Sequence, residues 1–314
     1  MIAASAVQKP RAVRAGSRFA VVAPASPAKN DALAAGQKEL ERLGFSVAPP
    51  KQHESEGYFA SSAKERADEF LAALRSDACD ALIATRGGYG SVYLLDEGFP
   101  AHFPAIKPLI GFSDLTTLQV YLWQKHRWTG FYGPMLAAGF NHGAGAPGGY
   151  DESSFLHALS GAQPSWTIPL RGATLTGGTA EGITLGGAMT LLEATVGTPW
   201  ELDTDGAILL LEDRAMKPYQ VDRVLMHLKH AGKLSKLRGI ILGDFPECEP
   251  PVADSPSVRD VCGRILSPLG IPIVFGTPVG HTARPMLTVP LGVRARLVAD
   301  GEGKLEILEP AVVA

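Results

Sequence analysis

Hydrophobic and polar positions in the first part of the chain alternate between short apolar runs and longer amphipathic stretches. The apolar runs have the length of buried strands and lie at residues 18–23, 45–48, 81–85 and 109–112. The other stretches repeat apolar residues at helical spacing, at residues 32–43, 63–74, 92–95 and 114–125. Strands that alternate with helices predict βαβ units around a parallel sheet. We therefore expect a flavodoxin-like α/β domain over residues 16–140.

The second part of the chain is richer in short apolar runs. From residue 141 to 178 the periodicity weakens around a Gly-Ala-Gly-Ala-Pro-Gly-Gly run, and we interpret this segment as an inter-domain linker. Strands are predicted beyond it at residues 181–185, 207–211, 239–243, 273–275 and within 295–308. Helices are predicted at residues 188–196, 218–231 and 257–266. This mixture predicts a C-terminal mixed α+β domain over residues 179–314.

The composition limits the classes of protein that the chain can form. Its 314 residues, 46% hydrophobic and 19% charged, predict a globular protein of two domains. A net charge of -3 without a basic run gives no case for nucleic acid, and no apolar stretch reaches the roughly 18 residues of a membrane helix. Residues 1–11 start apolar and then turn basic, the reverse of a signal peptide. We expect a loose N-terminal tail on a cytoplasmic protein that binds neither nucleic acid nor membrane.

The cysteines and histidines indicate neither disulfides nor a metal. Cys79, Cys248 and Cys262 are odd in number and far apart, and reduced thiols are typical of the cytoplasm. His227 and His230 share a predicted helix, but no Glu or Cys completes a zinc pattern beside them. We expect no metal and no other cofactor.

A serine stands where a predicted strand ends and a predicted helix begins. In Pro108-Leu-Ile-Gly-Phe-Ser113-Asp-Leu-Thr-Thr-Leu-Gln119 the apolar run stops at the serine, and helical spacing follows at once. A hydroxyl at such a corner projects from the backbone beside free helical N–H groups, as the nucleophiles of acyl-transfer enzymes do. Taken alone, the corner favours an ordinary helix N-cap, because Ser and Asp side chains accept from free N–H groups.

A glycine-rich turn, Arg86-Gly-Gly-Tyr-Gly90, follows another predicted strand. Taken alone, it favours a tight turn that needs positive φ, and the alternative is a loop that directs N–H groups at a negative oxygen. The pattern matches neither of the common phosphate-binding loops. Ser26, Arg86 and Ser113 all follow predicted strands, and the carboxyl ends of parallel strands meet at one edge of a sheet. We expect these residues to line one crevice.

The second part of the chain supplies an acid and a base. Glu212 and Asp213 follow the wholly apolar run at 207–211, so they either meet a partner in a cleft or lie in an exposed loop. His281 stands after Gly280 in a loop, where histidines are usually surface residues. With Ser113 these residues provide a nucleophile, an acid and a base in the chain order of α/β-hydrolases.

Six short motifs occur in an order that points to a family. They are Val21-Val-Ala-Pro-Ala-Ser-Pro27, Thr85-Arg-Gly-Gly-Tyr-Gly90, Ile110-Gly-Phe-Ser-Asp114, Glu181-Gly-Ile-Thr-Leu-Gly-Gly187, Leu211-Glu-Asp213 with Pro218-Tyr-Gln-Val-Asp-Arg223, and Gly280-His281 with Pro290-Leu-Gly292. Together they closely resemble the LD-carboxypeptidase family of serine peptidases, which includes murein tetrapeptide carboxypeptidases and microcin-C immunity peptidases. The resemblance extends over roughly residues 16–310, nearly the whole chain.

The resemblance implies a Ser-Glu-His triad at the interface between the two domains. By motif match, Ser113 is the nucleophile, His281 the general base and Glu212 the acid that orients the base. The triad draws its nucleophile from one domain and its acid and base from the other.

The resemblance also implies an oxyanion hole made of backbone N–H groups. Here these groups belong to Asp114 and Gly88, with Gly87 as the alternative to Gly88. Arg86 is a candidate for binding the free carboxylate of a substrate, because its guanidinium can bind carboxylates through two hydrogen bonds. A structural ion pair is its alternative role.

The activity that the resemblance implies is hydrolysis of an L,D-amide bond to a C-terminal D-amino acid. The substrate expected is murein tetrapeptide, which would lose D-Ala in cell-wall recycling, and the family suggests a homodimer. The alternatives are an immunity-type peptidase that cleaves aminoacyl-sulfamoyl adenylates and a non-catalytic protein that binds small anions. Three departures from the family pattern concern the substrate side of the site: Ala188 where Asn is common, Met216 where a second Glu is common, and Thr282 where Gly is common.

Overall fold

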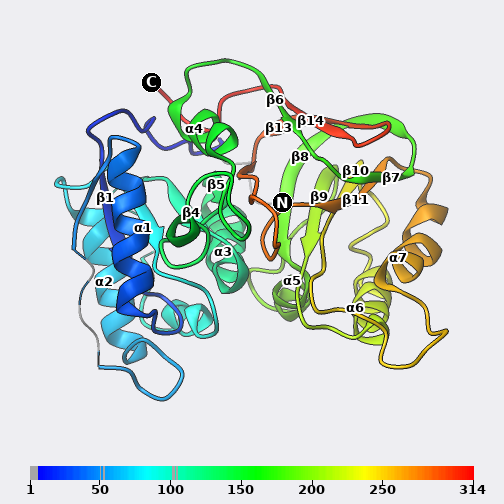
Figure 1. Ribbon diagram of the computed structural model, residues 1–314, viewed down its shortest axis with the longest axis horizontal. Helices are drawn as coiled ribbons and strands as arrows, with labels where there is room; N and C mark the ends of the chain where they lie inside the picture. The colour runs from blue at the N-terminus through cyan, green and yellow to red at the C-terminus, as the bar shows by residue number, and fades with distance from the viewer. Residues whose placement is uncertain (1–5, 50, 52–53, 101–102, 104) are drawn as a thin grey trace.

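Two sheets lie side by side in the protein (Figure 1). The structure is a computed structural model that describes residues 6–49, 51, 54–100, 103 and 105–314. The first sheet has the strand order β12-β5-β4-β3-β1-β2, and the second has the order β6-β14-β13-β8-β9-β10-β11-β7. The predicted architecture, an α/β half followed by a mixed α+β half, is confirmed.

The first sheet is parallel over the strands of the first half of the chain. These are β1 (Arg18–Val22), β2 (Ser46–Val47), β3 (Ala81–Ala84), β4 (Leu109–Gly111) and β5 (Gly130–Tyr132). The helices of this half are α1 (Asn30–Arg42), α2 (Ala63–Arg75) and α3 (Thr116–His126), and the helix expected near residues 92–95 is a 3-10 turn, Ser91–Leu95. Sequence analysis predicted each of these strands except β5.

A strand from the second half of the chain completes the first sheet. Strand β12 (Val289–Leu291) pairs antiparallel with β5 and forms one edge of the sheet. Pro290 at its centre has no N–H group to donate, which an edge strand tolerates. The first sheet is therefore mixed rather than wholly parallel.

The second sheet has a parallel centre and antiparallel flanks. Its parallel strands are β8 (Gly178–Ala188), β9 (Ala207–Glu212), β10 (Gly239–Gly243) and β11 (Ile273–Thr277). Strands β13 (Arg294–Ala299) and β14 (Lys304–Ile307) form a hairpin beside β8. The helices of this half are α5 (Met189–Thr195), α6 (Pro218–His230) and α7 (Val258–Leu266), close to the predicted positions.

The segment 141–178 contains regular structure that the sequence did not indicate. It holds α4 (Glu152–Ser160), β6 (Trp166–Pro169) and β7 (Ala173–Thr176). The two strands form opposite edges of the second sheet, and most of their residues are partly exposed, so they lack the apolar run by which a buried strand is recognised. The segment therefore connects the halves and also contributes two strands to the second sheet. The predicted domain limits, residues 16–140 and 179–314, stay a prediction.

Helix α3 joins the apolar cores of the two halves. Leu118 and Leu122 belong to the core around the first sheet, whereas Val120 and Trp123 belong to the core around the second. The helix is buried on most of its surface for this reason, and it begins directly after the corner that carries Ser113. The position of that corner is thus fixed by packing against both halves.

The N-terminal residues are more ordered than the sequence suggested, as far as the structure describes them. Residues 1–5 lie outside the described residues, but Gln8 forms a bridge to Trp128 and Arg11 forms one to Val313. The expected loose tail is therefore wrong for residues 8–11. No helix within the described ranges has the length and apolar character needed to cross a membrane.

Candidate active site

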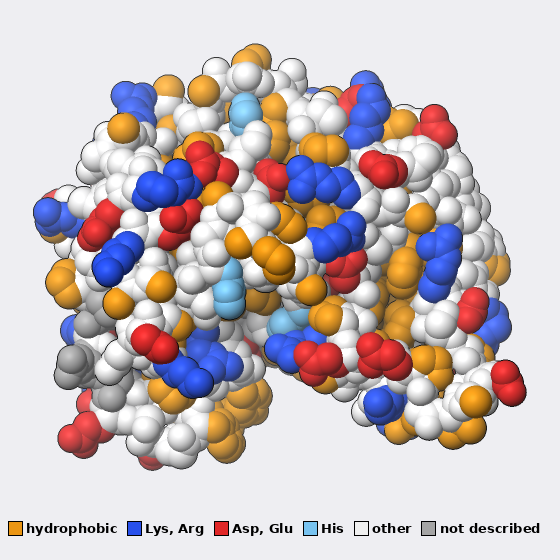
Figure 2. Space-filling view, viewed as in Figure 1, with side chains coloured by type: hydrophobic (Ala, Val, Ile, Leu, Met, Phe, Trp, Pro, Cys, Tyr) orange, Lys and Arg blue, Asp and Glu red, His pale blue; other side chains and the backbone are white. Residues whose placement is uncertain are grey.

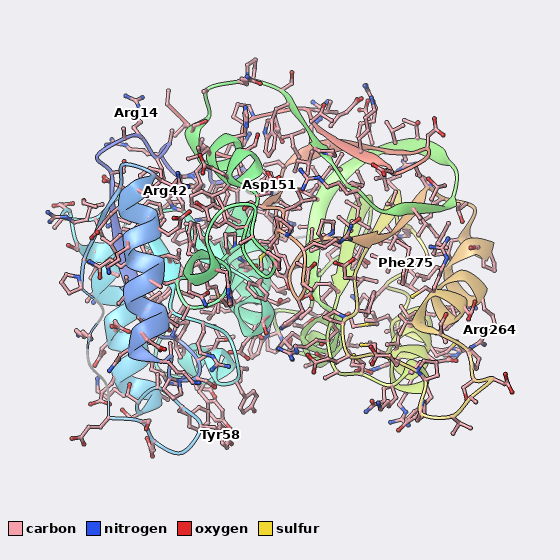
Figure 3. All side chains as sticks on the ribbon, in the orientation of Figure 1. Arg14, Arg42, Tyr58, Asp151, Arg264 and Phe275 are labelled. Atoms are coloured by element: carbon pink, nitrogen blue, oxygen red, sulfur yellow. The ribbon has the colours of Figure 1, made fainter. Side chains whose placement is uncertain are left out.

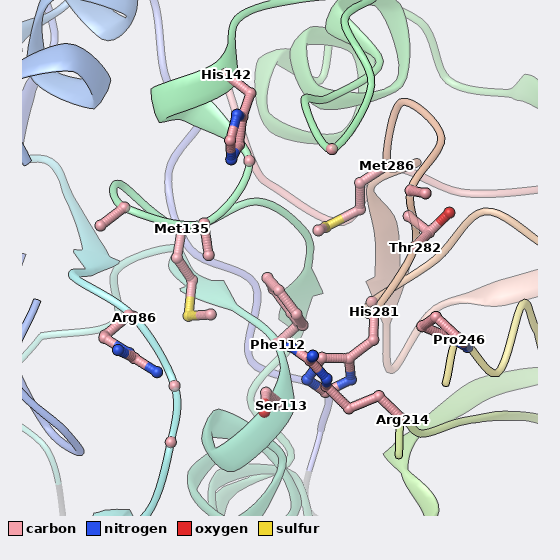
Figure 4. A pocket seen from close by; sticks show the side chains of 18 of the residues that line it. Arg86, Phe112, Ser113, Met135, His142, Arg214, Pro246, His281, Thr282 and Met286 are labelled. Atoms are coloured by element: carbon pink, nitrogen blue, oxygen red, sulfur yellow. The ribbon is translucent and has the colours of Figure 1, made fainter. Parts of the chain in front are cut away.

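The carboxyl ends of parallel strands from both sheets meet at one cavity of about 460 Å³. Its lining includes the turn after β3, the corner after β4, and the loops after β9, β10 and β11. In the space-filling view the molecule is hollowed between its two halves, and histidine side chains border the hollow (Figure 2). Arg86, Ser113, Arg214 and His281 all line this cavity (Figure 4). Arg86 and Ser113 thus line the crevice expected from strand ends, whereas Ser26 is not part of its lining: its hydroxyl accepts the N–H of Tyr89 at 3.2 Å.

Ser113 occupies a strained corner. Its φ of 61° is in the left-handed region that residues with a Cβ rarely adopt, and a 3-10 turn, Ser113–Leu115, starts there. Its side chain makes no N-cap hydrogen bond, and the N-cap position is taken by Phe112. The ordinary N-cap interpretation is thus wrong, and the backbone is bent so that the serine side chain lines the cavity.

Gly87 and Gly88 approach two serines too closely for any side chain. A Cβ on Gly87 would lie 2.9 Å from Cβ and 3.0 Å from Oγ of Ser113. Gly88 has a φ of 108°, and a Cβ there would lie 2.3 Å from Oγ of Ser26. The glycine pair therefore forms the expected turn with positive φ, at Gly88, and brings the backbone against Ser113, while a role of its N–H groups toward a negative oxygen stays a prediction.

Two buried charged side chains, those of Asp114 and Arg66, form hydrogen bonds that hold the turn containing these glycines. Asp114 accepts the N–H of Ser91 at 2.7 Å, and the Ser91 hydroxyl donates to the Asp114 carbonyl at 2.7 Å. Arg66 donates to the carbonyls of Gly90 at 2.7 Å and Pro24 at 2.5 Å. Burial raises the pKa of Asp114, while the hydrogen bonds from Ser91 and the charge of Arg66 oppose that rise.

Three backbone N–H groups beside Ser113 are available to a ligand. They belong to Gly87, Gly88 and Asp114, and no acceptor within the described residues receives a hydrogen bond from them. Unpaired N–H groups around a cavity attract a negative oxygen. Both Gly87 and Gly88 therefore offer an N–H group that could act together with that of Asp114.

Glu212 and His281 form a buried acid–imidazole pair. Nδ1 of His281 lies 2.8 Å from Oε2 of Glu212, and the same oxygen accepts the His281 N–H at 2.9 Å. Glu212 is wholly buried, and Gly280 passes so close to its carboxylate that a Cβ there would lie 2.3 Å from Cδ. Because a carboxylate only accepts, Nδ1 carries the proton and Nε2 is left free to accept one.

The phenol of Tyr132 is a site residue that sequence analysis missed. Its hydroxyl donates to Oε1 of Glu212 at 2.5 Å and accepts the N–H of Ser113 at 3.2 Å. Burial and the adjacent Glu212 carboxylate raise the pKa of Tyr132 well above its ordinary value, so the phenol stays protonated. Tyr132 ends strand β5, and the three-residue apolar run gave no signal of a polar role.

The two neighbouring carboxylates have different partners. Glu212 faces His281, whereas Asp213 accepts from the N–H and the hydroxyl of Thr190 at 3.0 and 2.7 Å and so caps the start of α5. The question that the sequence left open is thus answered: both carboxylates are partnered, and only Glu212 faces the imidazole.

The loop that carries His281 is held by a separate ion-pair network. Asp244 accepts from Nε and Nη2 of Arg284 at 3.1 and 2.5 Å and from the hydroxyl of Thr282. The same hydroxyl accepts the Arg284 N–H at 3.0 Å. Thr282, one of the departures noted in the sequence, thus fastens the loop to the end of β10.

Two contacts that the sequence analysis raised are not found among the described residues. The Ser113 hydroxyl and the His281 ring line the same cavity, but no hydrogen bond between them is among those of the described residues. In the part of the chain that the structure describes, the Arg86 guanidinium has neither an ion pair nor a hydrogen bond, so its structural-pair alternative is not observed. Within the same ranges, no group of three or more His, Cys, Asp or Glu side chains is placed to hold a metal ion.

The cavity is lined by a serine and by a histidine whose imidazole contacts a buried glutamate, and these are the residue types of serine-type hydrolases. Residues 19–133 match the LD-carboxypeptidase N-terminal domain, and residues 181–297 match the LD-carboxypeptidase C-terminal domain. The chain therefore belongs to the LD-carboxypeptidase family, as the resemblance implied.

Individual relatives agree with this assignment over nearly their whole length. The chain is 33% identical over 295 residues to a probable murein peptide carboxypeptidase of Bacillus subtilis, covering 92% of this chain and 91% of that one. It is 28% identical over 316 residues to the microcin C7 self-immunity protein MccF of Escherichia coli, covering 90% of each. The crystal structure of a muramoyltetrapeptide carboxypeptidase from Oxalobacter formigenes superposes with a TM-score of 0.79 at 27% identity, over 94% of this chain and 99% of that one.

Proposed function

We propose that the protein releases D-Ala from murein tetrapeptide by hydrolysing the amide between diaminopimelate and the terminal D-amino acid. The observation that carries this proposal is the wholly buried Glu212 carboxylate, which orients His281 beside Ser113 in the cavity. The relatives named as murein carboxypeptidases support the choice of substrate.

The first chemical step is acylation of Ser113. Nε2 of His281 takes the hydroxyl proton as Oγ attacks the amide carbonyl, and Glu212 stabilises the imidazolium that forms. The N–H groups of Asp114 and Gly88, with Gly87 as the alternative, receive the oxyanion. Each such donor contributes about 3 kcal/mol to lowering the barrier.

The second step frees the enzyme. Acylation is completed when His281 gives its proton to the amine of D-Ala and the C–N bond breaks; water activated by the same imidazole then attacks the acyl-enzyme, which releases the shortened peptide and restores the Ser113 hydroxyl. Arg86, whose guanidinium is unpaired within the described residues, binds the free carboxylate that defines a carboxypeptidase substrate.

The experiment that tests this proposal measures D-Ala release from diaminopimelate tetrapeptide. Wild type should release D-Ala, Ser113→Ala should abolish the release, and Ser153→Ala, at an exposed position on α4, should leave it unchanged. A fluorophosphonate should label wild type and the Ser153→Ala variant but not Ser113→Ala. Release by Ser113→Ala, or none by a wild type that is labelled, would contradict the proposed activity.

An aminoacyl-sulfamoyl nucleoside is the second candidate substrate. The observation in its favour is the 28% identity to the microcin C7 self-immunity protein over 90% of the chain. Glutamyl sulfamoyl adenosine added to the assay separates the two: cleavage of this compound without D-Ala release would favour the second candidate. A wild type that neither reacts with fluorophosphonate nor cleaves either compound would instead indicate a non-catalytic binder of small anions.

The proposal also includes the biological role, the location, the oligomeric state and the domain limits of the protein. The murein relatives support a role in recycling of cell-wall peptides, and the three free cysteines support a cytoplasmic location. We expect a homodimer, as the family resemblance implies, with an N-terminal domain over residues 16–140 and a C-terminal domain over residues 179–314.

A further inference from the structure

We propose that Arg214 and Glu247 together bind the zwitterionic end of a diamino dicarboxylic acid side chain, on the residue that supplies the scissile carbonyl. This inference rests on the proposed function and names the feature of the stem peptide that the site selects. Arg214 would bind the side-chain carboxylate, and Glu247 would bind the ammonium on the same carbon.

The first observation is the position of this pair in the cavity. Arg214 lies two residues beyond Glu212 in the loop after β9, and Glu247 lies in the loop after β10. Nη2 of Arg214 forms an ion pair with Oε1 of Glu247, and their side chains are 50% and 61% exposed, so a ligand can reach both. In Figure 4 Arg214 extends into the part of the cavity where Ser113 and His281 lie, and Arg86 stands on the other side.

The second observation is that the two loops are built together. The N–H of Ala215 donates to the carbonyl of Pro246 at 3.0 Å. Ala215, Phe245 and Glu247 have φ values of 54°, 50° and 60°, which residues with a Cβ adopt at a cost. An ordinary surface ion pair needs no such backbone, and strained positions of this kind gather at ligand sites.

The third observation is the charge pattern of the lining. Arg86 and Arg214 place two guanidinium groups in the cavity, and Glu247 is the one acidic side chain among the described residues that line it. The leaving D-amino acid has a single carboxylate, which Arg86 binds in the proposed mechanism. A second guanidinium with its own acidic partner is left for a further group that carries both charges.

The chemistry of the third stem residue decides what that group is. Diaminopimelate ends in an ammonium and a carboxylate on one carbon, so it can replace the Arg214–Glu247 contact with two matched ion pairs. A lysine side chain offers only the ammonium, so Glu247 would have to leave Arg214 without a partner. Selection through an unpaired charge is a common source of specificity, and the site should therefore prefer diaminopimelate stems to lysine stems.

The test compares kcat/KM for D-Ala release from three tetrapeptides, with diaminopimelate, amidated diaminopimelate or lysine at the third position. Wild type should prefer the diaminopimelate stem by about tenfold or more over both others, the range of a charged hydrogen bond. Arg214→Gln and Glu247→Gln should each reduce that preference about tenfold or more. Arg264→Gln is the control. It removes a similar ion pair far from the cavity, between Arg264 on α7 and Asp222 on α6, and should keep the wild-type preference (Figure 3).

The possible results separate this inference from the activity itself. Equal kcat/KM for the three stems, or an equal loss on all three in Arg214→Gln, would overturn the role of the pair while D-Ala release stands. No release from any stem by fluorophosphonate-reactive wild type would overturn the proposed function instead. The wild-type comparison of stems decides the matter even if a variant fails to fold.

Discussion

The hydroxyl of Tyr132 donates a hydrogen bond of 2.5 Å to Oε1 of Glu212. This contact joins the two sheets, because Tyr132 ends β5 of the first and Glu212 ends β9 of the second. The same phenol oxygen accepts the N–H of Ser113, so one side chain contacts both the corner of the proposed nucleophile and the proposed acid. Besides the packing of α3 against both halves, this buried hydroxyl therefore links the nucleophile and the acid directly.

Replacement of Tyr132 by Phe should lower the rate of D-Ala release. A hydrogen bond to a buried carboxylate contributes about 1.5–3 kcal/mol, so kcat should fall about 10- to 100-fold with a smaller change in KM. Tyr150→Phe is the matched control, because Tyr150 is also fully buried and donates to a carboxylate, Glu39, at 2.8 Å outside the cavity. Equal effects of the two variants on kcat would show that Tyr132 acts on stability alone.

Replacement of Gly87 by Ala should disable the site without unfolding the protein. The new Cβ would lie 2.9 Å from Cβ of Ser113, and a displacement of about 1 Å at a reacting group costs about 100-fold in rate. Gly263→Ala serves as control, since its Cβ meets nothing within 4 Å on helix α7 and should raise stability by about 0.5–1 kcal/mol. Full activity in Gly87→Ala would mean that the glycine turn is not part of the reacting geometry.

Asp114 should make the stability of the protein depend on pH in a particular direction. Burial raises its pKa in the folded state, so the folded protein binds more protons than the unfolded chain above about pH 4. The stability of wild type relative to Asp114→Asn should therefore fall as the pH rises from about 4 to about 7. Urea unfolding of both proteins across this range measures the difference, and a rise in it would contradict the effect of burial.

Removal of the Asp244 carboxylate should loosen the loop that carries His281. Asp244→Ala leaves Arg284 and Thr282 without their shared acceptor, and it should reduce the free energy of unfolding by about 2 kcal/mol and lower kcat. Asp205→Ala removes an exposed pair with Lys236 and should change stability by less than about 0.5 kcal/mol. Thermal unfolding and D-Ala release together test this, and equal destabilisation by the two variants would argue against the network.

Sequence reasoning succeeded where a pattern extends over many residues. The strands ending near Ala84 and Gly111 are short apolar runs flanked by amphipathic helices, and periodicity identifies them. It failed for β5 and β12 and for the partly exposed β6 and β7. These strands are defined by the neighbours with which they pair, and a local pattern contains no information about those partners.

Sequence reasoning likewise identified only some residues of the candidate site. Of the residues quoted in the family motifs, Arg86, Ser113 and His281 line one cavity, although their roles stay a prediction. Tyr132 and the Arg214–Glu247 pair could not be found, because their importance comes from contacts between segments far apart in sequence. The different partners of Glu212 and Asp213 also became known only from the structure, because adjacent side chains on a strand point to opposite faces.

The pairing of β12 with β5 has a consequence for how the protein is made. The sheet that carries Ser113 receives its last strand from residues 289–291, so its β5 edge stays uncovered until that segment has been translated. Ser113, Glu212 and His281 all precede that segment in the sequence. In a nascent chain the strand that ends at Tyr132 therefore gains its outer partner only after every residue of the proposed triad has been translated.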